Sequence, residues 1–225
     1  MFNVKSASSL VTNVINFSSE CLDGLSKVHL VDKDEAGSIS VEVDFFILIE
    51  PDLEWLSANQ DDIRSKDALT LILTTAEKPY SGIDCPDIID KVLVVSDGSY
   101  KVFINDIIDT LTSDNMIGVD FGDFRFVMRE GSTATLYSGG YTKEEHFYMD
   151  YFEQYFVDSI DYTKLKALFI IISFSIDFIS GIDDFEHVSN FFRGQVPEDL
   201  NLTLVVTGHF TLDQQGARVS AILVE

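Results

Sequence analysis

The sequence predicts an α/β protein with a mostly parallel sheet. Short apolar runs rich in Val, Ile and Phe alternate along the chain with amphipathic or acidic segments, which is the pattern of successive β-α-β units. Hydrophobic residues make up 46% of the 225 residues, enough to bury the core of one large domain or two small ones.

Strands are predicted in the first half wherever a short apolar run is bounded by polar residues. These runs are Lys27–Val31, Val43–Ile49, Leu69–Thr75 and Lys91–Val95. Near-helical spacing of apolar residues from Ser9 to Leu22, with Gly24 in a C-cap position, predicts a helix before the first strand. The acidic segment Trp55–Asp67 could be a helix or a loop.

The middle of the chain predicts a helix followed by an acidic loop. Val102–Leu111 carries a wide apolar stripe, as a helix packed on a core does. It leads into Asp114–Asp123, which contains three aspartates and two glycines.

The second half predicts a further α+β domain of helices on a sheet. Its predicted strands are Thr133–Tyr137, Ala167–Ser175, Leu202–Thr207 and Val219–Val224. Two capping pairs, Thr142 with Glu145 and Asp183 with Glu186, predict helix starts between them. We expect the aromatic stripe after the first pair to face the core and not a ligand or partner groove.

Composition excludes several classes of partner. Fifteen Lys and Arg against 38 Asp and Glu give a formal net charge of −23, which repels nucleic acid and anionic membrane surfaces. The most hydrophobic segment, Ala167–Ile176, is half as long as the stretch of about 20 residues that spans a bilayer, so direct membrane insertion is not expected. Without a secretory signal, a CxxC motif or a Cys/His cluster, we expect a cytoplasmic protein with no metal site.

A conventional active site is not recognisable. The histidines have no metal-site spacing, and neither GxxxxGK[ST] nor GxGxxG is present. We therefore expect no enzyme activity and no cofactor.

Four motifs match those of one known family in the same order along the chain. Met116–Met128, MIGVDFGDFRFVM, is similar to the catalytic loop that joins the central helix to the second domain in the FtsZ/tubulin family. Supporting matches are Ala68–Thr75 with Lys78–Tyr80, Ile182–Asn190 and Asp199–Gly208. The resemblance implies a reduced FtsZ/tubulin-like fold. It consists of a degenerate nucleotide-binding domain at 1–95, a shortened central helix and catalytic-type loop at 96–124, and a C-terminal domain at 125–225.

The resemblance gives the acidic loop a role in a neighbouring subunit. In the family this loop enters the next subunit's nucleotide site and helps to position the attacking water. Asp120 and Asp123 are thus candidates for catalysis in trans, and Gly118 and Phe121 complete the expected interface. The alternative from the residues alone is that Asp120 is an N-cap and Asp123 a first-turn acid, and the two roles are compatible.

The phosphate-binding positions depart from the family. The glycine-rich turn is replaced by Ser6, Ser8 and Ser9 around Ala7, and the GGGTGTG loop by Glu50, Pro51 and Asp52. Phosphate binding needs converging backbone N–H groups, whereas Pro51 removes one donor and the acids repel the anion. A like-charge pair about 4 Å apart costs on the order of 4 kcal/mol at an effective dielectric constant near 20. GTP and GDP binding is therefore predicted to be lost.

These features predict an FtsZ-like cytoskeletal or cell-division protein without its own GTP site. It would act as a pseudo-GTPase regulator, cap or scaffold of an FtsZ-type filament, and its partner would be an FtsZ-like protein or itself. The alternatives are a self-assembling structural protein and a divergent GTPase with an altered phosphate site.

Overall fold

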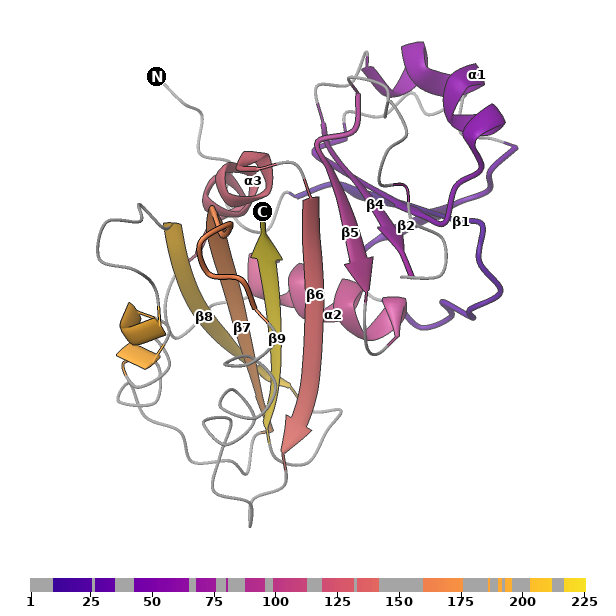
Figure 1. The fold of residues 1–225 in the computed structure, drawn as a ribbon. Coiled ribbons are helices and arrows are strands. Elements are labelled where there is room, and N and C mark those ends of the chain that lie inside the picture. The colour runs from indigo at the N-terminus through magenta and orange to yellow at the C-terminus, as the bar shows by residue number, and fades with distance from the viewer. Residues whose placement is uncertain are drawn as a thin grey trace, which may run out of the picture.

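A nine-stranded sheet forms the framework of the protein (Figure 1). The computed structural model describes residues 10–25, 27–34, 43–64, 68–75, 80, 88–95, 99–112, 119–131, 133–141, 160–175, 186, 190–191, 193–195, 203–211 and 217–225. The strands are β1 (Thr12–Asn16), β2 (His29–Val31), β3 (Phe45–Ile49), β4 (Leu69–Thr74), β5 (Lys91–Val95), β6 (Thr133–Tyr141), β7 (Ala167–Ser175), β8 (Thr203–Thr211) and β9 (Ala217–Val224). The helices with described bounds are α1 (Leu53–Arg64), α2 (Tyr100–Thr112) and α3 (Phe121–Arg129), and residues 186, 190–191 and 193–195 are also helical.

The sheet is mostly parallel, as predicted. Its order is β2-β1-β3-β4-β5-β6-β9-β7-β8, and only β9 runs antiparallel to its neighbours. One sheet passes through both halves of the chain because β6 pairs with β5 on one side and β9 on the other. The domain boundaries expected at residues 95 and 124 stay predictions.

The strand order reverses between β1 and β3. The chain continues from β1 to β2 on one side, then crosses back so that β3 lies on the other side of β1. The loops that leave β1 and β3 therefore diverge, and a crevice opens outside the carboxyl ends of the strands.

Helices cover both faces of the first half of this sheet. Residues of α2 and α3 pack with alternate residues of β3, β4, β7 and β9 in one core cluster. On the opposite face, α1 contributes Leu56 and Ile63 to a second cluster with Leu48 and Ile72. Every residue of β3 and β4 is buried, which explains why β3 is entirely apolar and why β4 contains only two threonines among its apolar residues.

The helix predicted over Ser9–Leu22 is wrong, because the segment forms strand β1. Val11, Thr12, Val14 and Ile15 are β-branched, which favours a strand, and Thr12 to Ile15 are buried. Their spacing fits both the helical and the strand period over so short a run. Gly24 has the expected positive φ of 83°, but it lies in a turn and not at the end of a helix.

The other described elements follow the predictions closely. β5 and β7 begin and end at the predicted residues, and β6 and β8 are longer than predicted. The acidic segment after β3 is helix α1. Thr142 and Glu145, the aromatic stripe after them and Asp183 lie outside the described residues. Among the residues that are described, no helix is long and apolar enough to cross a bilayer.

A buried ion pair fastens α2 to the second half of the sheet. Asp106 of α2 is 2% exposed and accepts hydrogen bonds from both Nε, at 2.9 Å, and Nη2 of Arg218 on β9. The Ser173 and Ser220 hydroxyl groups donate to the same carboxylate, each at 3.2 Å. The carboxylate is thus satisfied by four donors from β7 and β9.

Lys91, at the start of β5, is a buried lysine that holds the end of α3. It is 1% exposed, and its Nζ donates to the carbonyl oxygens of Glu130 and, at 2.8 Å, Gly131. Burial lowers its pKa from 10.5 to about 8, against the attraction of Asp90 and Glu130.

Stability should therefore depend on pH through Lys91. Between the lowered folded pKa and 10.5 the unfolded chain binds a proton that the native state does not, so the Lys91 contribution to stability rises with pH. In urea titrations, the difference in unfolding free energy between the unmodified protein and Lys91→Met should increase by about 1 kcal/mol or more from about pH 7 to about pH 10. Lys27→Met, which removes an exposed lysine, is the matched control. A pH-independent difference would contradict the assignment.

Candidate functional site

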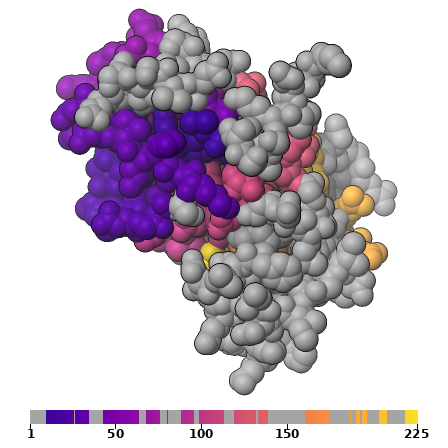
Figure 2. Space-filling model, turned by 180° about the vertical axis from the view of Figure 1, so that it is seen from behind, coloured from indigo at the N-terminus to yellow at the C-terminus, as the bar shows by residue number. Residues whose placement is uncertain are grey.

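The crevice lies where the loops after β1, β2 and β3 diverge. Its volume is about 650 Å³. The apolar part of its lining consists of Val14, Phe17, Leu22, Leu30 and Val31. The charged part consists of Asp23, Asp32, Lys33, Glu50 and Asp52. In the space-filling view from behind, the N-terminal residues that supply this lining (indigo to purple) form one lobe of the surface (Figure 2).

The turn after β1 is folded around Asn16. The Asn16 Oδ1 atom accepts from the Ser18 backbone N–H at 3.0 Å and from the Ser18 hydroxyl at 2.7 Å. Its Nδ2 donates to the carbonyl oxygen of Glu20 at 2.8 Å. These bonds pair polar groups of the turn with one another and hold the backbone at Glu20 in place.

Glu20 occupies the N-terminus of α2. Its carboxylate accepts from the backbone N–H groups of Tyr100 and Lys101, both at 3.1 Å, and from the Ser99 hydroxyl. Free N–H groups and the helix dipole make a helix N-terminus an anion-binding site. At the N-terminus of α2 the Glu20 carboxylate of the protein already takes the place of a bound anion. The sequence carried no signal for Glu20, because its partners are 80 residues away.

The loop after β3 is fixed by two tyrosines. The Tyr100 hydroxyl donates to the Glu50 carboxylate at 2.9 Å, and the Tyr80 hydroxyl donates to the carbonyl oxygen of Pro51. Burial raises the pKa of Tyr100, and the hydrogen bond to Glu50 raises it further. Glu50 has a φ of 49°, in the left-handed region where a non-glycine residue is strained, so the loop depends on these contacts.

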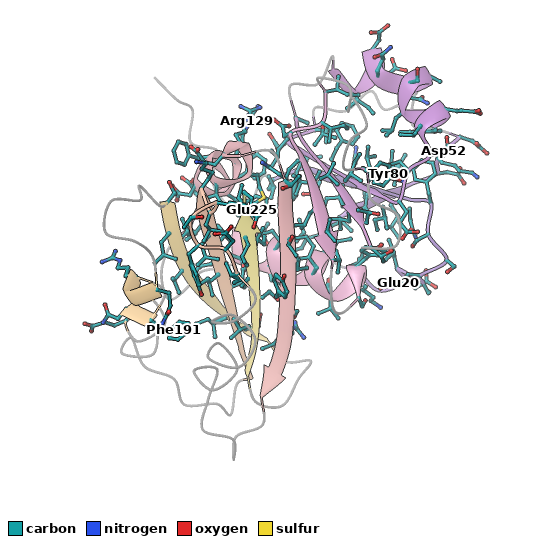
Figure 3. The ribbon with its side chains drawn as sticks, viewed as in Figure 1. Glu20, Asp52, Tyr80, Arg129, Phe191 and Glu225 are labelled. Atoms are coloured by element: carbon teal, nitrogen blue, oxygen red, sulfur yellow. The ribbon has the colours of Figure 1, made fainter. Side chains whose placement is uncertain are left out.

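Asp52 caps α1 in the same crevice. Its Oδ1 accepts from the Trp55 backbone N–H at 2.6 Å, and its carbonyl oxygen accepts from Leu56 at 3.1 Å. A second helix N-terminus is therefore also occupied by a carboxylate of the protein. Figure 3 shows Glu20, Asp52 and Tyr80 on this N-terminal half of the sheet, apart from Arg129 on α3.

The predicted phosphate-loop positions are placed in part. Glu50 and Asp52 line the crevice, and Pro51 is buried beside them. Ser6, Ser8 and Ser9 lie outside the described residues and precede β1 in the chain. The serines were predicted to form the turn after the first strand. In the structure the turn that follows β1, the first described strand, runs from Phe17 to Leu22.

Asp120 and Asp123 form a reciprocal capping box at the start of α3. The Asp123 N–H donates to Asp120 Oδ1 at 2.9 Å, and the Asp120 N–H donates to Asp123 Oδ2 at 3.2 Å. The predicted N-cap role of Asp120 and the first-turn position of Asp123 are confirmed, and the bond from the Asp120 N–H to Asp123 adds a capping role for Asp123. Both side chains are exposed. Their role in trans stays a prediction, and Gly118 lies outside the described residues.

The α3 face is defined here as Asp120, Phe121, Asp123 and Phe126. It lies at the amino-terminal ends of the parallel strands, whereas the crevice lies at their carboxyl ends. The Phe121 ring packs 5.8 Å from that of Phe45, the first residue of β3, whereas the crevice follows the last residue of β3. Phe126 is 58% exposed on this face. Arg129, at the end of α3, forms an ion pair with Asp90 at 2.9 Å.

Solved structures share this fold. An FtsZ W319Y mutant from M. jannaschii is 14% identical to the chain, with a TM-score of 0.56, and the match covers 86% of this chain and 69% of that one. An empty FtsZ dimer from M. jannaschii is 15% identical, with a TM-score of 0.57, and the match covers 85% and 65%. The chain thus spans about two thirds of the FtsZ chains. No protein-family model matches the sequence, and no curated protein matches it. These structural neighbours show that the chain has a reduced FtsZ/tubulin-like fold.

Proposed function

We propose that this chain is a divergent FtsZ-like cytoskeletal protein that has no GTP site of its own. It docks its α3 face on the nucleotide end of an FtsZ-type filament in the cytoplasm and acts there as a regulator, cap or scaffold. Asp120 and Asp123 lie at the contact and need only geometry and charge for this role.

The observation that carries the proposal is that carboxylates of the chain occupy the N–H groups that a phosphate would use. Glu20 takes two amides of α2, and Asp52 takes one of α1. A triphosphate would have to displace the Glu20 and Asp52 carboxylates and would then lie near Glu50. Each pair of a phosphate charge and a carboxylate is repulsive by up to about 4 kcal/mol near 4 Å, and by less where solvent screens it.

Trp55 provides a direct test of nucleotide binding. It is the only tryptophan of the chain, and its ring lies 5.0 Å from that of Phe17, which lines the crevice. Its Nε1 also donates to the carbonyl oxygen of Lys33 at 3.0 Å. Titration with GTP or GDP, with and without Mg²⁺, should leave its fluorescence unchanged up to about 1 mM nucleotide. Saturable binding at micromolar concentrations would overturn the proposal in favour of a divergent GTPase.

The α3 contact has a separate test. Asp120→Asn with Asp123→Asn removes both charges while keeping an acceptor oxygen at each cap position. The unmodified protein should alter FtsZ assembly and GTPase rate at substoichiometric levels, and the double variant should lose at least about nine-tenths of that effect. Asp61→Asn with Asp62→Asn, on the exposed part of α1, removes the same charge elsewhere. An equal loss in both variants would mean that net charge, and not the α3 face, is responsible.

Self-assembly is the second candidate, and the exposed Phe126 on the α3 face favours it. In this case the α3 face of one copy would contact the crevice end of another. Because the net charge of −23 opposes association, light scattering of the protein alone should rise when salt or divalent cations are added. Flat scattering in both conditions would exclude this candidate.

A further inference from the structure

We propose that the crevice binds a basic peptide segment that carries an apolar anchor residue. The proposal concerns the end of the molecule opposite the α3 face, and therefore goes beyond the docking proposed above. It rests on the charge, the exposed apolar surface and the occupied helix ends of the crevice.

The charged lining selects cations. Four carboxylates, those of Asp23, Asp32, Glu50 and Asp52, line the crevice with one ammonium group, that of Lys33. Three of the four belong to exposed residues, and Glu50 is half-buried. Throughout the described ranges, no three acidic, His or Cys side chains converge as a metal ion would require. Spread charges of this kind suit the separated Lys and Arg side chains of a peptide.

The apolar lining calls for a hydrophobic anchor. Leu30 lines the crevice and is 51% exposed, and Leu53, which follows Asp52, is 46% exposed. Exposed leucines beside a concave surface mark an interaction site more specifically than single exposed residues elsewhere do. A volume of about 650 Å³ accommodates a few side chains of a bound segment.

The occupied helix ends exclude the opposite kind of ligand. Asp52, which lines the crevice, already accepts from the Trp55 N–H group at the start of α1. Glu20 fills the start of α2, which lies behind the lining and reaches it through the Tyr100 hydroxyl on Glu50, so neither of these described helix ends is free to receive an anion. The crevice that the fold would use for a phosphate chain is acidic in this protein. Its complementary partner is a basic chain with a leucine-like anchor.

The test uses the full chain and a fluorescein-labelled peptide of repeated Lys-Leu-Arg-Ala units, followed by anisotropy and by Trp55 fluorescence. Binding should be saturable, should change Trp55 emission and should weaken as salt is added. Asp23→Asn with Asp32→Asn should weaken it at least about fivefold, and Leu30→Ser about tenfold. A peptide with Ser in place of Leu should bind at least about fivefold more weakly than the original.

Two control variants separate this site from other effects. Asp61→Asn with Asp62→Asn removes equal charge outside the crevice and should bind like the unmodified protein. Asp120→Asn with Asp123→Asn should also retain peptide binding, even where it abolishes the effect on FtsZ. Equal weakening in the α1 variant, unchanged binding of the Ser-containing peptide, or no binding at all would each overturn the proposal.

Discussion

Arg218→Met is expected to lower the free energy of unfolding by about 3 to 5 kcal/mol. The substitution removes the two donors of the guanidinium group from Asp106 and leaves a carboxylate that is 2% exposed without its counter-charge. The Ser173 and Ser220 hydroxyl groups remain as donors, but neutral hydrogen bonds do not replace the lost attraction. Urea denaturation at neutral pH measures the effect.

A double variant separates the cost of the unpaired charge from the value of the pair. Asp106→Leu with Arg218→Met replaces both charges with apolar groups and should recover most of the lost stability, because neither ion then needs solvation. The Ser220 hydroxyl keeps a partner in Ser138, 3.2 Å away. If Arg218→Met alone costs less than about 1 kcal/mol, the pair does not hold α2 to the sheet as described.

Phe124→Ala, a separate substitution, is expected to lower the free energy of unfolding by about 3 to 5 kcal/mol. Phe124 of α3 is fully buried between the two halves of the sheet. Its ring lies 5.8 Å from Phe45 of β3 and 5.2 Å from Phe169 of β7, both in edge-to-face geometry. The substitution leaves a cavity and removes two aromatic pairs, each worth about 0.5 to 1.5 kcal/mol beyond their buried area.

The same helix offers a matched control. Phe126→Ala removes an identical side chain that is 58% exposed, so its cost should stay within about 0.5 kcal/mol. Phe124→Leu retains most of the volume and should cost less than about 1.5 kcal/mol. Thermal or urea unfolding of the three variants side by side checks the order. Similar costs for the Phe124→Ala and Phe126→Ala variants would mean that α3 is not anchored through Phe124.

The candidate sites divide between local and distant contacts. The capping box of Asp120 and Asp123 and the acids after β3 were predictable, because each depends on residues a few positions apart. Glu20, which fills the N-terminus of α2, was not, since its partners lie 80 residues along the chain. The exposed Leu30 gave no signal either, because exposure follows from the packing of other segments.

The sequence by itself determined most of the described strands and helices and the predominance of parallel pairing. Long apolar runs such as those of β3 and β7 bury both faces, and only a covered strand tolerates that composition. It did not determine β1, where five residues fit two periods and burial between β2 and β3 decides.

Only the tertiary structure decided the strand order and the long-range polar contacts. Arg218 meets Asp106 across 112 residues, and Lys91 reaches the end of α3 across 39. Local propensity acts over a few residues, whereas these contacts exist only after α2 and α3 have packed on the assembled sheet. Assembly of the sheet also brings acids from separate parts of the sequence together in the lining of one crevice, where the strand order reverses.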